Sequence, residues 1–214
     1  MSELQAIFGG TFDPVHYGHL RTVEALAALT GLQKVTLLPN NVPPHRPQPV
    51  ASPRQRLEML RCAIAGSSLF DIDDRELHRD APSWTVTTLR SLRAERGPDQ
   101  PLAFIIGQDS LLSLNKWHRW EELLSLSHLL VCRRPEYPEQ PASEELRHWI
   151  DTHAAQESRQ LRQQPCGLIF QAETPLWPVS ATAIRHRLQQ NLSCEGLLPP
   201  SVINYITRSG LYRD

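Results

Sequence analysis

The stretch Gly9-Gly10-Thr11-Phe12-Asp13-Pro14-Val15-His16-Tyr17-Gly18-His19 joins the first apolar run of the chain to its first amphipathic segment. The apolar run at 4–8 predicts a strand, and the spacing of apolar residues over 19–29 predicts a helix. Glycines let the backbone come close to a ligand, and a helix amino terminus offers free N–H groups and a partial positive charge. The stretch is therefore a candidate phosphate-binding loop between a strand and a helix.

The rest of the chain repeats this alternation of apolar runs and amphipathic stretches. Further strands are predicted at 35–38, 69–72, 102–106, 129–132 and 168–170, and further helices at 54–65, 84–96, 119–126, 182–190 and 201–208. The polar stretch 144–162 predicts either a helix or an ordered surface excursion. Such alternation indicates an α/β protein with a doubly wound, mainly parallel sheet and helices on both faces. Ligands of such sheets bind beyond the carboxyl ends of the strands, where Gly9-Gly10, 39–49 and Gly107-Gln108-Asp109 fall.

Composition narrows the class of protein. The chain has 214 residues with 22 Lys and Arg against 23 Asp and Glu, so its formal net charge is -1. This balance argues against a protein held on a nucleic acid polymer by bulk charge. No apolar run approaches the ~20 residues of a membrane helix, and no signal peptide is recognisable, so we expect a soluble cytoplasmic protein without membrane attachment.

The four cysteines lie too far apart for zinc or redox spacing, and Cys132 and Cys166, in apolar runs, are expected to be buried.

Other interpretations of the opening loop are weaker. The loop lacks the Gly-x-Gly-x-x-Gly dinucleotide fingerprint and the Gly-Lys-Ser/Thr of a P-loop. A zinc site would need at least a third ligand beside His16 and His19. The plainest alternative is a strand–helix turn with incidental histidines, which the whole pattern disfavours.

The loop resembles the nucleotidyltransferase superfamily signature Gly-Gly-x-Phe-x-Pro-x-His-x-Gly-His at every fixed position. A second stretch, Val179-Ser180-Ala181-Thr182-Ala183-Ile184-Arg185, resembles the superfamily's Ile-Ser-x-Thr-x-Ile-Arg. The resemblance implies a Rossmann-like single domain over 1–214, in which 179–214 form a C-terminal helical segment that completes the ATP site. It also implies adenylyl or cytidylyl transfer, with the nucleotide over the end of the first strand.

The second stretch also has a reading from its residues alone. Ser180 is a good N-cap, and Ser180 and Thr182 could do no more than cap the helix that follows. A cation as close to a helix start as Arg185 opposes the helix dipole, which is easier to understand if an anion binds there. By resemblance, Ser180 and Arg185 hold the triphosphate tail.

Four further motifs are similar to those of bacterial nicotinate mononucleotide adenylyltransferases: Pro43-Pro44-His45-Arg46-Pro47, Pro82-Ser83-Trp84-Thr85, Gly107-Gln108-Asp109-Ser110-Leu111 with Trp117, and Cys132-Arg133-Arg134-Pro135. Trp84 stands where most relatives have tyrosine, so the ring is kept and the hydroxyl is lost. A pyridine ring can stack on Trp117, and Thr85 with nearby N–H groups can bind a carboxylate. Other roles stay open, with Trp117 a core aromatic, Trp84 and Thr85 a helix start, and Asp109 an N-cap.

The resemblance implies transfer of the adenylyl group of ATP to nicotinate mononucleotide in NAD biosynthesis, with Mg²⁺ carried by ATP and no protein metal site. It implies three sets of residues: catalytic His16, His19 and Arg46; ATP-binding Gly9, Gly10, Thr11, Phe12, His16, Gly18, His19, Asn40, Gly107, Asp109, Ser180, Thr182 and Arg185; and mononucleotide-binding Asn40, His45, Arg46, Ser83, Trp84, Thr85, Asp109, Trp117 and Arg134. The alternatives are an adenylyltransferase for nicotinamide mononucleotide or phosphopantetheine, a non-catalytic nucleotide-binding regulator, and a metal-dependent hydrolase.

Overall fold

The computed structural model describes residues 3–41, 47–133 and 136–214. Its centre is a six-stranded sheet in the order β3-β2-β1-β4-β5-β6, in which every strand pairing is parallel. The strands are β1 Gln5–Gly10, β2 Val35–Pro39, β3 Phe70–Ile72, β4 Leu102–Gly107, β5 His128–Arg133 and β6 Ile169–Glu173. The predicted strands are confirmed, with ends shifted by a few residues.

The helices connect the strands and extend the chain beyond the sheet. They are α1 Tyr17–Thr30, α2 Pro53–Ile64, α3 Thr85–Arg96, α4 Gln108–Leu112, α5 Leu123–Leu126, α6 Glu144–Thr152, α7 Ala181–Gln189 and α8 Pro200–Ser209. Among the described residues, four short 3-10 helices accompany them: η1 Arg75–His78, η2 Leu114–Lys116, η3 Trp120–Glu122 and η4 Ser158–Arg162.

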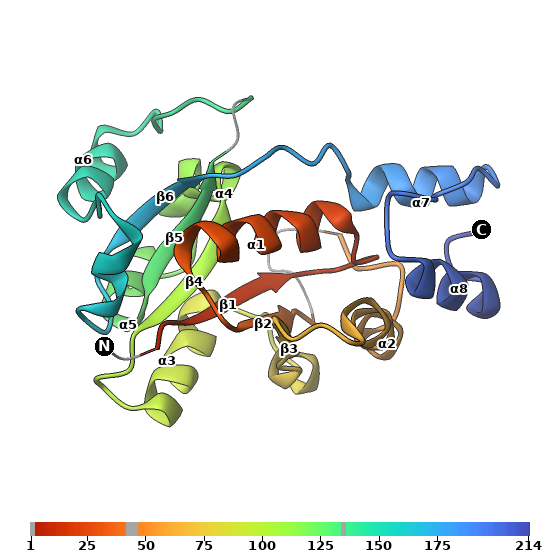
Figure 1. The fold of residues 1–214 in the computed structure, drawn as a ribbon, viewed down its shortest axis with the longest axis horizontal. Helices are drawn as coiled ribbons and strands as arrows, with labels where there is room; N and C mark the ends of the chain where they lie inside the picture. Colours follow the sequence, from red (N-terminus) through yellow and green to blue (C-terminus); the bar gives the residue numbers. More distant parts are fainter. Residues whose placement is uncertain (1–2, 42–46, 134–135) are drawn as a thin grey trace.

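Both faces of the sheet are covered, which explains why the central strands read as continuous apolar runs. In β4, Ala103 and Ile105 belong to a core cluster shared with α1 and α2. Phe104 and Ile106 belong to a second cluster shared with α3 and α6. Figure 1 shows α1 and α3 on opposite faces of the sheet. The doubly wound α/β class is confirmed.

The strand order reverses at β1, which pairs with β2 on one side and with β4 on the other. The chain first builds one half of the sheet outward from β1 and then returns to build the other half from β4. Such a switch point leaves an opening beyond the carboxyl ends of the two central strands. The loop that follows Gly10 and the helix that follows Gly107 begin there.

Four details differ from the sequence predictions. The stretch 119–126 forms a 3-10 helix, η3, followed by the short helix α5, instead of one helix. The stretch 144–162 is not one helix: α6 ends at Thr152, and η4 follows after a turn. The helix α4 directly after β4 was not predicted, since it is only five residues long. Cys166 is half-buried rather than buried, because it lies in the turn before β6, where its Sγ donates to the Ser125 carbonyl (3.4 Å).

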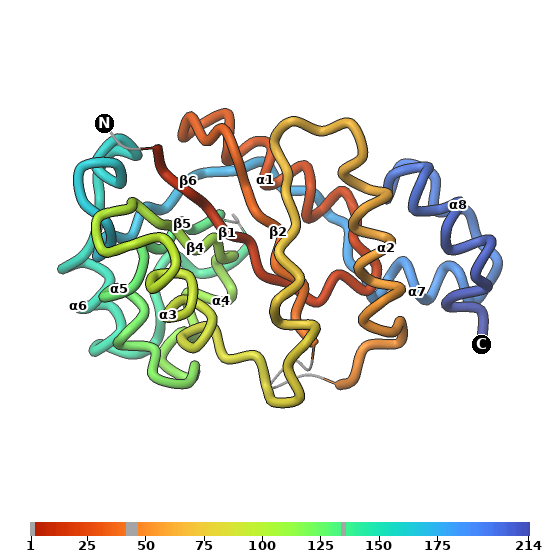
Figure 2. Tube along the Cα trace, turned by 90° about the horizontal axis from the view of Figure 1, so that it is seen from below, coloured from red at the N-terminus to blue at the C-terminus, as the bar shows by residue number. Residues whose placement is uncertain are grey.

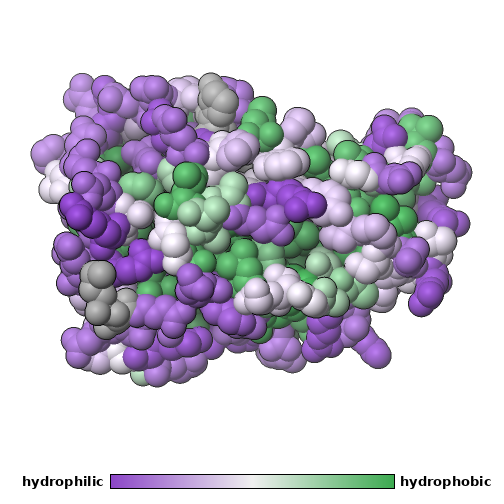
Figure 3. All heavy atoms as spheres, in the orientation of Figure 1, coloured by the Kyte–Doolittle hydropathy of each residue, from purple (hydrophilic) through white to green (hydrophobic). Residues whose placement is uncertain are grey.

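The segment after β6 forms the end of the molecule opposite α6, with the helices α7 and α8 (Figures 1 and 2). It is tied back to the rest of the chain: the Ser201 hydroxyl donates to the Cys62 carbonyl (2.9 Å), and the Tyr17 N–H donates to the Leu197 carbonyl (2.9 Å). Figure 3 shows hydrophilic residues over the α6 end and hydrophobic residues toward the middle of this face. Within the described ranges, no helix is long and apolar enough to cross a membrane.

Candidate active site

The loop between β1 and α1 has an unusual backbone at Phe12, whose φ of 53° lies in the left-handed region. Its side chain is 1 % exposed, and its ring fills the space beside Gly10, where a Cβ would lie 2.9 Å from the ring. Glycine at position 10 therefore has an internal reason, the packing of Phe12, in addition to the close ligand approach expected from sequence.

The two signature histidines support each other. His16 is the N-cap of α1, and its ring stacks on that of His19 with centroids 3.7 Å apart. The His16 N–H donates to Nδ1 of His19 (3.2 Å), and the Phe12 ring meets His19 edge-on at 5.0 Å. Because Nδ1 of His19 accepts a hydrogen bond, its neutral ring carries the proton on Nε2. The placement of both histidines at the helix start, as predicted, is confirmed.

The second signature lies directly against the first. A Cβ added at Gly18 would lie 2.8 Å from the Val179 carbonyl oxygen, so this close approach of α1 to the residue before Ser180 requires glycine. Gly18 is a helical residue, and its role at this point is packing. The predicted N-cap is confirmed, since the Ser180 hydroxyl accepts the Ala183 N–H (3.1 Å).

Arg185 has partners within the protein. Its Nη1 donates to the Asp13 carbonyl (2.8 Å), and its Nη2 donates to the Thr182 hydroxyl (3.3 Å). The loop carbonyl and the Thr182 hydroxyl therefore also account for a cation at this helix start, beside the anion that the sequence suggested. The role of Arg185 toward phosphate stays a prediction.

Asn40 and Thr11 meet where β1 and β2 end. The Asn40 amide donates to the Thr11 hydroxyl (3.3 Å), and the Asn40 N–H donates to the Gly10 carbonyl (3.0 Å). Its Oδ1 is buried and has no hydrogen-bond partner among the described residues. A buried acceptor without a donor is unfavourable, so it suits a ligand that brings an N–H or hydroxyl group.

Arg56, on α2, is a site residue that the sequence analysis missed. It is 0 % exposed, and its guanidinium donates to the carbonyls of Thr11 (2.8 Å), Asn40 (2.6 Å) and Asn41 (3.3 Å). Burial lowers the pKa of this guanidinium. A signal was present, since Arg56 falls three and four residues before Met59 and Leu60 on the buried face of α2. We call 9–19, Asn40 and 179–185 the phosphate end of the site.

A second region is made of 83–85 and 107–118, which include the predicted pyridine residues Trp84, Thr85 and Trp117, and we call it the pyridine end. Trp84 and Trp117 are half-buried and pack on the second core cluster, so the alternative core role of Trp117 is partly right. The Trp84 ring lies 4.8 Å from that of His118, a residue not predicted for the site. Thr85 begins α3, whose amino terminus has no side-chain cap.

The pyridine end lies at the same sheet edge as the phosphate end. The Asn41 amide, just beyond β2, donates to the Arg79 carbonyl (2.6 Å) in the stretch that leads to Ser83. Asp109 lies in the first turn of α4, directly after β4. Gly107, not Asp109, is the N-cap of α4, so the alternative N-cap role of Asp109 is wrong.

Three of the predicted residues, His45, Arg46 and Arg134, lie outside the described residues.

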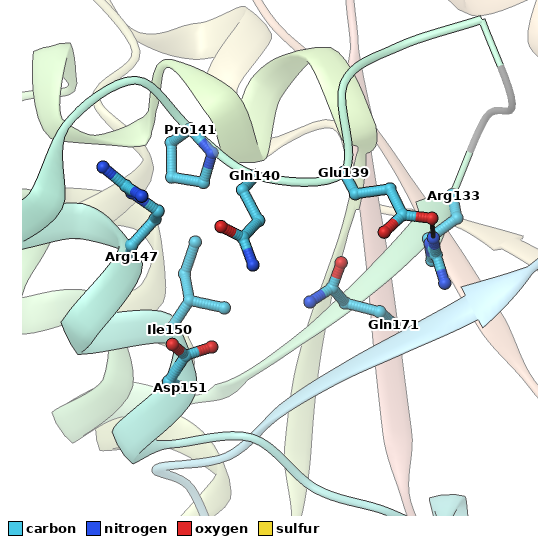
Figure 4. Close-up of a pocket in the computed structure, with 8 residues that line it drawn as sticks. All are labelled: Arg133, Glu139, Gln140, Pro141, Arg147, Ile150, Asp151 and Gln171. Carbon is cyan, nitrogen blue, oxygen red and sulfur yellow. Dashed lines mark hydrogen bonds and ion pairs between the residues drawn. The ribbon is translucent and has the colours of Figure 1, made fainter.

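A separate open cavity lies beside α6 (Figure 4), lined by Arg133, Glu139, Gln140, Pro141, Arg147, Ile150, Asp151 and Gln171. Within it Arg133 pairs with Glu139 (3.0 Å). It contains none of the predicted site residues.

Comparison with known proteins identifies the family. The family model described as cytidylyltransferase-like matches residues 7–187. A protein of Pectobacterium atrosepticum, named "Probable nicotinate-nucleotide adenylyltransferase", is 58% identical over 213 residues, 100% of both chains. One of the same name from Serratia proteamaculans is 59% identical over 98% of this chain and 96% of its own.

The fold has a counterpart among solved structures. Plasmodium falciparum nicotinic acid mononucleotide adenylyltransferase, complexed with NaAD, superposes with a TM-score of 0.73 at 18% identity, covering 98% of this chain and 97% of its own. The two signatures, the order of the strands and these relatives together establish that the chain belongs to the cytidylyltransferase-like family, as a nucleotidyltransferase related to the nicotinate-nucleotide adenylyltransferases.

Proposed function

We propose that the chain transfers the adenylyl group of ATP to nicotinate mononucleotide, forming nicotinate adenine dinucleotide and pyrophosphate in NAD biosynthesis. The observation that supports this best is the meeting of the two signatures. Gly18 packs against the Val179 carbonyl, and Arg185 donates to the Asp13 carbonyl at 2.8 Å. Two segments with phosphate-binding chemistry, far apart in sequence, thus lie together beyond the end of β1.

The reaction needs alignment more than proton transfer. An oxygen of the acceptor phosphate, already ionised near neutral pH, forms a bond to the α-phosphorus of ATP. The bond from that phosphorus to the bridging oxygen breaks, and the electron pair leaves with pyrophosphate. His16 and His19 donate hydrogen bonds to oxygens of the α- and β-phosphates, where charge develops. The His19 proton on Nε2 suits this role, since the His16 N–H occupies Nδ1 (3.2 Å).

The metal is proposed to arrive with the nucleotide. In the described part of the chain, no group of three or more His, Cys, Asp or Glu side chains could hold a metal ion. Mg²⁺ suits a site of this kind, because it binds through substrate phosphates and keeps several waters instead of needing a full set of protein ligands. When bound, it supplies positive charge to the triphosphate. Ser180 and Arg185 are assigned to the triphosphate tail, as the signature implies, and Thr182 to ATP binding.

The acceptor is assigned to the pyridine end. Trp117 offers an aromatic face to the pyridine ring, and Thr85 with the uncapped start of α3 offers donors to the nicotinate carboxylate. Asp109 is assigned to ribose hydroxyls. Arg46, Arg134 and His45 stay predictions from the motifs, as do the single-domain boundary 1–214, the completion of the ATP site by 179–214 and the cytoplasmic location.

The test is a turnover assay with matched acceptors. Protein, ATP and Mg²⁺ are mixed with nicotinate mononucleotide or with nicotinamide mononucleotide, and pyrophosphate and dinucleotide are measured. We expect faster turnover with the acid. Equal rates would contradict the carboxylate assignment. If neither mononucleotide gives any pyrophosphate, the chain is better explained as a nucleotide-binding regulator. Tight zinc in elemental analysis of the purified protein would instead favour a hydrolase.

A further inference from the structure

Asp13 lies in the phosphate-binding loop, yet its carboxylate is directed into the protein and the residue is only 5 % exposed. Its Oδ2 accepts the Val50 N–H (2.8 Å). Its Oδ1 accepts both the Ala51 N–H (3.0 Å) and the Tyr212 hydroxyl (2.7 Å). The carboxylate is thus engaged by three internal donors, which suits a residue that holds structure rather than one that binds substrate.

These donors come from two segments that lie far from Asp13, and far from each other, in the sequence. Val50 and Ala51 follow the proline-rich stretch 39–49, which the sequence assigned to substrate binding. Arg185, from the second signature, donates to the Asp13 carbonyl (2.8 Å) and lies 3.9 Å from Oδ2. Asp13 therefore connects the signature loop, the 50–51 backbone and Arg185 to Tyr212.

Backbone conformation gives a second, independent observation. Phe12, directly before Asp13, has a φ of 53°, and Tyr212 has a φ of 63°. A bulky residue rarely adopts this left-handed region, and it persists only where surrounding contacts hold it. Phe12 is 1 % exposed and Tyr212 is 5 % exposed. The Asp13–Tyr212 hydrogen bond joins two segments that both need such support.

We propose that Asp13 and Tyr212 are a positioning pair for adenylyl transfer, in which the Tyr212 hydroxyl fixes the carboxylate that holds the signature loop, the 50–51 backbone and Arg185 in register for the triphosphate. This inference rests on the proposed function. Neither residue is assigned a contact with substrate. Burial and the Asp13 hydrogen bond raise the pKa of Tyr212, so its hydroxyl stays a donor over the working pH range.

The test is Tyr212→Phe, which keeps the ring and removes only the hydroxyl. We expect kcat to fall about tenfold, the scale for losing a hydrogen bond to a charged group. We expect the KM for ATP to rise while that for nicotinate mononucleotide stays within about twofold, because only the phosphate end is displaced. Calorimetric binding of Mg·ATP without acceptor should weaken in parallel. Asp13→Asn is a poorer first test, since it disturbs three hydrogen bonds in the interior.

Tyr205→Phe is the matched control, because this half-buried tyrosine of α8 is not among the donors to Asp13. It should leave kcat, both KM values and ATP affinity unchanged. Wild-type kinetics and ATP affinity in Tyr212→Phe would overturn the proposal. So would an equal rise in both KM values with a lower melting temperature, which indicates general loss of packing. If the wild type turns over neither mononucleotide, the proposed function fails. The calorimetric comparison of Mg·ATP binding still tests whether Asp13 and Tyr212 position the phosphate end.

Discussion

At the phosphate end of the site, charged side chains hold backbone carbonyls from distant segments, in addition to the ring contacts of the loop, whereas at the pyridine end aromatic rings contact one another and apolar core residues. Arg56 and Arg185 each donate to carbonyls of the signature loop, at 2.8 Å in both cases. At the other end, Trp84 and His118 are joined by ring contact at 4.8 Å, and Trp84 and Trp117 rest on apolar core residues.

The difference suits what each end is proposed to bind. Phosphoryl chemistry depends on donors placed to within a fraction of an ångström, which a hydrogen-bonded backbone provides. A flat ring depends on contact area, which tolerates small shifts of the surface that it meets. We therefore expect changes at the phosphate end to act mainly on kcat and changes at the pyridine end mainly on the KM of the acceptor.

The largest expected effect comes from His19→Ala. Removing one preorganised donor should lower kcat by about 10² or more. Steady-state kinetics with both substrates varied provide the measurement, and His186→Ala, an exposed histidine of α7, is the control. Turnover within a few-fold of wild type would show that His19 has no catalytic contact.

Gly18→Ala tests the contact between the two signatures. The added methyl would lie 2.8 Å from the Val179 carbonyl and from the His16 ring, so α7 or the loop must move. We expect kcat/KM for ATP to fall about tenfold, since misplacement of this size is costly in aligned reactions. Thermal unfolding should show a loss of about 1–3 kcal/mol of stability. Glu24→Ala, on the exposed side of α1, is the control; normal ATP kinetics in Gly18→Ala would contradict the expectation.

Trp117→Ala tests the pyridine end. We expect the KM for the mononucleotide to rise about tenfold, the upper range of an aromatic contact, with the KM for ATP nearly unchanged. Trp117→Phe keeps an aromatic face and should recover much of the loss. Equal effects on both substrates would remove the distinction between the two ends.

The smallest expected effect is on stability. It concerns His128, at the amino end of β5, away from the carboxyl ends of the strands where the site lies. His128 is 0 % exposed; its Nδ1 accepts the Leu168 N–H (3.0 Å), and its Nε2 faces the Gln164 carbonyl (2.9 Å). Burial lowers the pKa of this imidazole from 6.5. Below about pH 6.5 the unfolded chain binds a proton that the folded chain does not, so the free energy of unfolding falls as pH falls toward the lowered pKa.

Urea unfolding at several pH values measures this dependence, with a slope of at most about 1.4 kcal/mol per pH unit from this group. His128→Asn should flatten the curve between pH 6.5 and the lowered pKa, while His148→Asn, an exposed residue of α6, should not. A curve unchanged by His128→Asn would show that other groups set the pH dependence.

Local sequence pattern was sufficient for much of the fold. Apolar runs marked every strand of the sheet, and Ser180 marked a helix start. The polar stretch 144–162 was harder, because its buried residues Leu146, Ile150 and Leu161 serve two short elements rather than one. The helix α4 is too short to have a periodic pattern of its own.

In the site, signature residues could be placed from sequence, but the residues that support them could not. Arg56 looks like a surface cation until its carbonyl partners are known. Asp13 looks like an ordinary loop acid, and Tyr212 like a core aromatic. Each acts through a partner far away in the chain, and a single sequence contains no signal for such pairing.

The bond between Asp13 and Tyr212 spans 199 positions of the chain. A contact of such separation forms late, because the intervening segments must be ordered before its ends can meet. During synthesis, the loop emerges from the ribosome long before Tyr212 does. A nascent chain can therefore build its sheet while the phosphate end is still unfinished, and competence to use ATP is expected to arrive only when folding is nearly complete.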